Sequence, residues 1–235
     1  MNKIEFTIVT DGILSFAIRK DNQRPWWWYL DIQGEPLYLI SNLCGTCEAI
    51  FRRVSERNLP LTPRQFSDLL EAGMTTIPWL AIEMVTALLP RGNYTAELIT
   101  AAPTLITQRT SRPEVACEAG YYWLQNLQKT DQGIKYELFL PLVPIPALDQ
   151  TRIDFYKSQI DAGGKPSALV LTLEDSRNPR GNPYYQSARA HFLLDGHHKM
   201  MAATQLGKPI TVLSFLYKGC EDGYLSRSLF DHVKK

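Results

Sequence analysis

The alternation of hydrophobic and polar positions predicts a mixture of strands and helices in the first part of the chain. Residues 4–18 alternate enough to predict a strand or a hairpin, and the apolar runs at 26–30 and 36–40 flank a polar turn. Residues 44–54 and 77–89 have helical spacing, and Thr62-Pro63 predicts the start of a further helix that Gly73 ends. Strands are predicted over 94–107, interrupted at Pro103, and a hairpin over 120–140.

The second part of the chain shows a more regular order. A helical run that begins near residue 148 reaches 160, an apolar strand follows at 168–173, and another strand opens at His191. A helix follows the dipeptide Asp195-Gly196, and a last strand covers 210–215. The pattern predicts an α+β fold with an N-terminal region, 1–138, and a C-terminal domain, 139–235, whose sheet could continue into the first region.

Three consecutive tryptophans stand in the first predicted hairpin. In a strand, Trp26 and Trp28 face one side and Trp27 faces the other, so both faces would be covered. This favours core packing, with an aromatic platform for a base or a sugar as the alternative.

Residues 191–203 carry the clearest chemical signal. A short strand turns through Asp195-Gly196 into a helix that opens with His197, His198 and Lys199. Such a turn directs backbone N–H groups and the positive end of the helix dipole at one point, where phosphate binds well. The alternative interpretation is a capped helix with histidines on the surface.

The order of these motifs resembles the ParB/sulfiredoxin superfamily over about residues 139–217. The resemblance rests on a V-P-I start at Val143, an L-D-x-x-[KR] helix start from Leu148 to Arg152, and the glycine box at Gly196 followed by Ala202 and Ala203. It implies a shared nucleotide-binding fold. His197 replaces the cysteine nucleophile of sulfiredoxin, so that thiol chemistry is absent.

The box also departs from the G-E-R-R sequence of partition proteins and is closest to a D-G-H-H-[RK] branch that includes free-serine kinases. Lys199 stands where that branch usually has arginine, which keeps the charge and loses the bidentate fork. Few residues follow the box, which leaves little room for the helix-turn-helix domain of a partition protein.

The resemblance implies roles for individual residues. It assigns nucleotide binding to Arg152, Gly196, His197, His198 and Lys199, and catalysis to Asp195 and His198. Asp195 could bind Mg²⁺ or accept a hydroxyl proton, and it could equally be a turn residue. Arg152 could instead be solvated, and the two histidines could serve only at the helix start.

The pair Cys44 and Cys47 is a second chemical candidate. A C-x-x-C sequence at a helix start has the position of a redox pair, and it is also half of a zinc site. No second C-x-x-C exists, and only four cysteines are present. Idle cysteines are therefore favoured over zinc or a redox pair.

Composition limits the remaining classes. The chain has 235 residues, 45% hydrophobic and 21% charged, with a formal net charge of +1. No long basic run is present, which argues against nucleic acid as a partner. No apolar stretch reaches membrane-spanning length and the first residues lack a signal-peptide core, so a cytoplasmic protein without a membrane partner is predicted.

The sequence therefore predicts a phosphotransferase or nucleotide hydrolase that uses ATP, ADP or CTP with Mg²⁺. The acceptor would be a small molecule or a protein, which the sequence does not name, and the oligomeric state also stays open. The alternatives are a non-catalytic, nucleotide-gated interaction module and a redox or zinc protein centred on Cys44 and Cys47.

Overall fold

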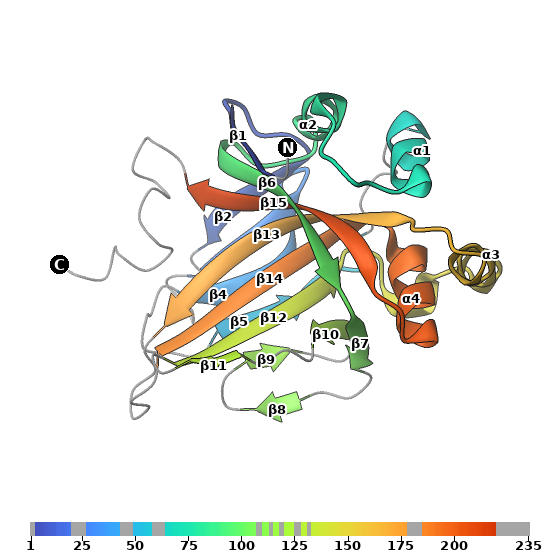
Figure 1. The fold of residues 1–235 in the computed structure, drawn as a ribbon. Helices are drawn as coiled ribbons and strands as arrows, with labels where there is room; N and C mark the ends of the chain where they lie inside the picture. The colour runs from blue at the N-terminus through green and yellow to red at the C-terminus, as the bar shows by residue number, and fades with distance from the viewer. Residues whose placement is uncertain are drawn as a thin grey trace.

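The computed structural model combines two β-sheets with helices that lie at one end and along one side (Figure 1). It describes residues 3–19, 27–42, 49–57, 64–106, 110–112, 115–117, 120–124, 128–130, 133–177 and 185–219. Strands and helices alternate irregularly along the chain, so the predicted α+β class is confirmed. Within these residues no helix is long and apolar enough to cross a bilayer.

The larger sheet contains nine of the described strands. Its order is β1-β6-β15-β13-β14-β12-β10-β7, with β11 paired to β12. The strands are β1 (Lys3–Ile8), β6 (Gly92–Ala101), β7 (Pro103–Ile106), β10 (Tyr121–Leu124), β11 (Gln128–Thr130), β12 (Gly133–Pro141), β13 (Ser167–Arg177), β14 (Tyr185–Asp195) and β15 (Ile210–Gly219). The pairs β12·β14 and β13·β15 are parallel, whereas β13·β14 and β15·β6 are antiparallel.

The smaller sheet contains six described strands in the order β2-β3-β4-β5-β9-β8. They are β2 (Leu14–Arg19), β3 (Trp27–Ile32), β4 (Glu35–Asn42), β5 (Ala49–Arg53), β8 (Thr110–Arg112) and β9 (Val115–Cys117). The predicted hairpin of β3 and β4 is confirmed. Gln33 and Gly34 both have positive φ, 52° and 79°, as a tight two-residue hairpin turn requires.

Four α-helices are described: α1 (Arg64–Ala72), α2 (Trp79–Val85), α3 (Gln150–Asp161) and α4 (His197–Leu206), with a 3-10 turn η1 at Ile145–Ala147. The elements predicted in the second part of the chain are all present, although β14 begins at Tyr185, before the predicted start at His191. The Asp149 carboxylate begins α3 by accepting a hydrogen bond from the Thr151 backbone N–H at 2.8 Å. The helix predicted over 77–89 is shorter, since α2 ends at Val85.

The helix predicted over 44–54 is wrong for its described residues, 49–54. Residues 49–53 form β5, which pairs with β4 on one side and β9 on the other. Phe51 is buried in the core, and Arg53 donates hydrogen bonds to the carbonyls of Pro141 and Leu142 at 3.2 and 2.8 Å. These long-range partners outweigh the local helical spacing.

The two sheets enclose the larger hydrophobic core. Trp28 of β3 lies in it with residues of β12, β13 and β14, so core packing is confirmed for this tryptophan. Along β13, Leu169 and Leu171 face this core, whereas Ala168 and Val170 face a second core beneath α3 and α4.

The larger sheet curls strongly. Strands β6 and β7 are separated in sequence by one residue, Ala102, although they lie near opposite ends of the sheet order. The sheet therefore bends back toward itself, and α4 packs on its concave side against β7, β13 and β15. The helix and the loop before it are thus supported on several sides.

The boundary expected at residue 139 falls inside β12. Strands from before it, β1, β6, β7 and β10, share one sheet with β13, β14 and β15 from after it. The core between the sheets likewise draws on both parts of the chain. The N-terminal half is consequently in a position to contribute to a site at α4.

Candidate functional site

The turn from β14 into α4 has the geometry that the glycine box predicts. Gly196 is the residue before the helix, with φ of 89° in the left-handed region. A Cβ at this position would lie 2.8 Å from the Cβ and 2.9 Å from the Cα of Ala168 in β13. Glycine is therefore required both by the backbone conformation and by the close approach of a neighbouring strand.

The first turn of α4 carries no side-chain cap. The Asp195 carboxylate accepts a hydrogen bond from the Gly196 backbone N–H, one position before the helix, and no side-chain hydrogen bond caps the helix at Gly196. The first N–H groups of a helix have no partner within it, and the helix dipole adds partial positive charge. The geometry suits an anion.

Lys199 is the most unusual residue of this region. It is 2% exposed, and its Nζ has no hydrogen-bond partner in the part of the chain that the structure describes. The nitrogen lies 5.5 Å from the centre of the Tyr156 ring on α3. Burial lowers the pKa of Lys199. The carboxylates of Asp195 and Glu71 oppose this shift, whereas the positive charge of Arg152 adds to it.

Helix α3 brings Arg152 and Tyr156 to the same place. The Tyr156 hydroxyl donates a hydrogen bond to Glu71 Oε1 of α1 at 2.8 Å. Burial, with Glu71 as the next cause, raises the pKa of Tyr156 to about 12, and a hydrogen bond with Arg152 acts in the opposite direction. Arg152 is exposed, so its guanidinium is accessible from solvent.

Glu71 is a member of this cluster that sequence reasoning missed. It lies far from the box in sequence and belongs to no recognisable motif. Helix α1 reaches the site because the backbone N–H of Met74, just after the helix, donates to Ser167 Oγ at the start of β13 at 3.0 Å. Only the tertiary contact places Glu71 beside Tyr156.

His197 points into the protein. Its side chain is buried, and its Nε2 accepts a hydrogen bond from the Val143 backbone N–H at 3.0 Å. The ring also bonds to the backbone of Leu193, and burial lowers its pKa to about 4. His197 is therefore neutral at pH 7, and its side chain joins the loop after β12 to the start of α4.

His198 makes a similar contact at the surface. Its Nε2 accepts a hydrogen bond from the Asp149 backbone N–H at 3.1 Å, which links α4 to the start of α3. Partial burial and the nearby Arg152 lower its pKa. The acceptor nitrogen is occupied by this bond, so a role as proton acceptor would require the bond to break.

The structure thus brings five of the predicted site residues to one place: Arg152, Asp195, Gly196, His198 and Lys199. The side chain of His197 is directed away from it. Cys44 and Cys47 lie outside the described residues, and no group of three or more histidine, cysteine or acidic side chains able to hold a metal is found in the part that is described.

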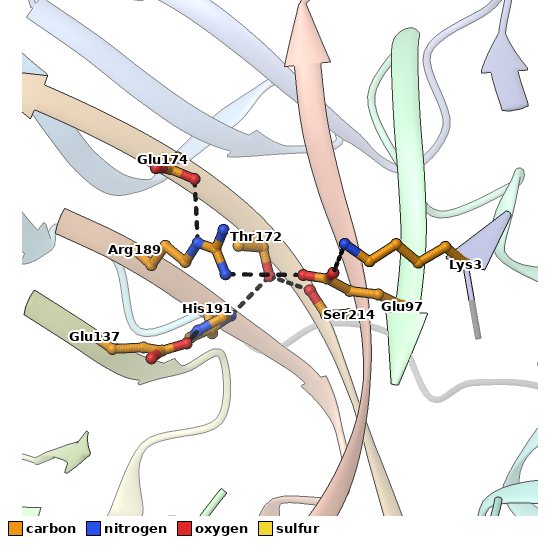
Figure 2. A network of polar contacts seen from close by, with 8 residues as sticks. All are labelled: Lys3, Glu97, Glu137, Thr172, Glu174, Arg189, His191 and Ser214. Atoms are coloured by element: carbon orange, nitrogen blue, oxygen red, sulfur yellow. Dashed lines mark hydrogen bonds and ion pairs between the residues drawn. The ribbon is translucent and has the colours of Figure 1, made fainter. Parts of the chain in front are cut away.

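A second polar cluster is drawn in Figure 2. Thr172 and His191 lie on the same face of β13 and β14 as Val170 and Leu193, which pack in the core with α4. His191 Nδ1 is 2.7 Å from Thr172 Oγ1, His191 Nε2 is 2.8 Å from Glu137 Oε1, and Thr172 Oγ1 is 2.8 Å from Ser214 Oγ. Burial lowers the pKa of His191, although Glu137 opposes this. The neutral ring then donates from Nε2 to the carboxylate and accepts at Nδ1 from threonine.

This cluster combines a hydroxyl, an imidazole and a carboxylate, as a nucleophilic site does. Thr172 and Ser214 are both buried, however, and both hydroxyls already have hydrogen-bond partners within the sheet, unlike Lys199 Nζ. Around them, Arg189 pairs with Glu174 and Glu97, and Lys3 pairs with Glu97. The contacts join neighbouring strands, and we assign the cluster to the stability of the sheet.

Comparison of the chain with protein-family models, with curated proteins and with solved structures gave no match. The resemblance to the ParB/sulfiredoxin superfamily consequently stays a prediction from the sequence.

Proposed function

We propose that the N-terminal turn of α4, together with Lys199 and Arg152, binds the phosphate groups of a nucleotide. The observation that carries this proposal is the Lys199 amine, which is buried at the start of a helix and has no hydrogen-bond acceptor among the described residues. A buried charged donor without a partner is costly, and an arriving phosphate would supply the missing acceptor and the missing negative charge.

Two further features support an anion rather than a neutral ligand. The helix start carries no side-chain cap, so its N–H groups suit phosphate oxygens. Arg152 is exposed on the adjacent helix, where its guanidinium could bind a second phosphate group. A polyphosphate would therefore bridge the starts of α3 and α4.

The nucleotide and the reaction come from the sequence resemblance. It favours ATP, ADP or CTP as the ligand and transfer or hydrolysis of the terminal phosphoryl group as the reaction. Mg²⁺ usually accompanies such phosphates, bound through one or two carboxylates and the nucleotide itself. No preformed metal cluster is found among the described residues, so we derive no step through the ion.

Isothermal titration with ATP, ADP, CTP and GTP tests the binding. Lys199→Met and Arg152→Met should each weaken the tightest nucleotide by about tenfold or more, because each removes a charge-assisted contact of about 1.5–3 kcal/mol. Lys199→Met is a suitable variant because an apolar side chain of similar size replaces a buried charge.

Lys208→Met is the matched control. Lys208 follows α4, is half-exposed and pairs with Asp161 at 2.7 Å, away from the helix start. Its replacement should change affinity by less than about twofold, because surface ion pairs contribute little. The proposal fails if none of the four nucleotides binds the wild-type protein.

Asp195 tests whether binding leads to chemistry. Its carboxylate lies beside the box, so Asp195→Asn should depress turnover far more than nucleotide affinity if it acts in the transition state. Equal losses of both, or no loss, would reduce Asp195 to a turn residue. Nucleotide binding without any turnover would favour the non-catalytic interaction module.

A further inference from the structure

We infer that the Lys199 amine holds its proton less tightly in the ligand-free protein than when phosphate is bound at the start of α4. The inference rests on the proposed phosphate site and concerns its regulation: nucleotide binding and proton uptake would be coupled at one residue.

The surroundings of the Lys199 nitrogen favour the neutral form. An ammonium group carries three N–H donors, and none of them finds an acceptor here. The face of Tyr156, 5.5 Å away, offers an attraction of at most about 2 kcal/mol, which does not replace lost hydration. A neutral amine avoids most of this cost.

The charged groups that face Lys199 come from three elements. Asp195 at the end of β14 and Glu71 on α1 favour the ammonium form, whereas Arg152 on α3 disfavours it. Neither carboxylate makes a hydrogen bond with Nζ, and burial outweighs both of them. Desolvation therefore makes the amine of the ligand-free site easier to deprotonate.

A bound phosphate reverses this balance. Its oxygens supply acceptors and negative charge at the helix start, which raises the pKa of the amine. A neutral amine then takes a proton from water or a buffer acid, which is left as its conjugate base, and no bond of the protein or the nucleotide breaks. Above the pKa of the ligand-free amine and below that of the bound form, each binding event takes up a proton. Nucleotide affinity should then fall by up to about tenfold for each pH unit in this interval.

Isothermal titration at pH 8.5 in two buffers of different ionisation enthalpy measures this uptake. At that pH the terminal phosphates and the histidines are already deprotonated. For whichever of ATP, ADP, CTP or GTP binds most tightly, the wild-type protein should take up protons on binding, and the uptake should be larger when the titration is repeated about one pH unit higher.

Lys199→Arg separates charge from protonation. Arginine stays charged at this pH, so the variant should bind nucleotide without proton uptake. Lys199→Met should also show no uptake, with weaker binding, and it replaces Lys199→Arg as the test if the larger side chain prevents folding. Lys208→Met, the surface control, should retain the wild-type uptake.

The outcomes separate the two proposals. Nucleotide binding without proton uptake in the wild type, or uptake that persists in Lys199→Met, overturns the coupling and leaves the phosphate site standing. If no nucleotide binds, the phosphate site fails and the coupling fails with it.

Discussion

Lowering the pH should destabilise the protein through His197. The pKa of this buried ring is lowered to about 4, whereas that of an unfolded histidine is about 6.5. The unfolded chain therefore binds the proton more readily. The stability due to the neutral ring is complete above pH 6.5 and is lost as the pH falls toward 4.

The size of the effect follows from these two values. Going from pH 7 to pH 5 should remove about 2 kcal/mol of unfolding free energy, and about 3 kcal/mol should be gone at pH 4. The structural reason is that protonation would place a second donor on the ring. That donor would face the Val143 N–H, which now donates to Nε2.

Urea unfolding of the wild type and of His197→Gln at pH 7, 6 and 5 measures this contribution. Glutamine keeps an acceptor oxygen near the Nε2 position and does not titrate. The contributions of the carboxylates and of His191 to the pH dependence are the same in both proteins, so they cancel when the two stabilities are subtracted. The stability advantage of the wild type should shrink by about 2 kcal/mol between pH 7 and 5. His198→Gln, at the half-buried neighbour, is the control and should show a smaller change. A difference for His197→Gln that does not vary with pH would refute the reasoning.

Three further substitutions test the framework of the site. Gly196→Ala should lower the unfolding free energy, measured in urea, by about 2–4 kcal/mol, because the new methyl group would clash with Ala168 and the backbone is left-handed. A loss below about 1 kcal/mol would contradict this. Thr172→Val should lower the unfolding free energy by about 1–3 kcal/mol, because His191 Nδ1 loses its hydrogen-bond partner. A variant as stable as the wild type would argue against the assigned hydrogen-bond network. Arg53→Met should lower the unfolding free energy by about 2 kcal/mol, because the Leu142 carbonyl loses its donor, whereas the Pro141 carbonyl keeps the Tyr38 hydroxyl. An unchanged urea midpoint would show that the Arg53 contact is dispensable.

Elements encoded by short-range signals were predictable. The hairpin of β3 and β4, the start of α3 at Asp149 and the turn through Gly196 each depend on a few neighbouring residues. Residues 49–53 show the opposite case, because their helical spacing was overruled by partners in β4 and β9. A single sequence does not reveal which distant strand will offer those partners.

The same division holds for the candidate site. The sequence by itself determined a strand, a glycine turn and a helix that together suit an anion, since caps, positive φ and helix dipoles are local properties. Only the tertiary structure decided that Lys199 is buried without an acceptor, that His197 faces inward and that Glu71 of α1 reaches Tyr156. Burial and pKa depend on what other segments place around a side chain, and that arrangement exists only once the sheet has curled around α4.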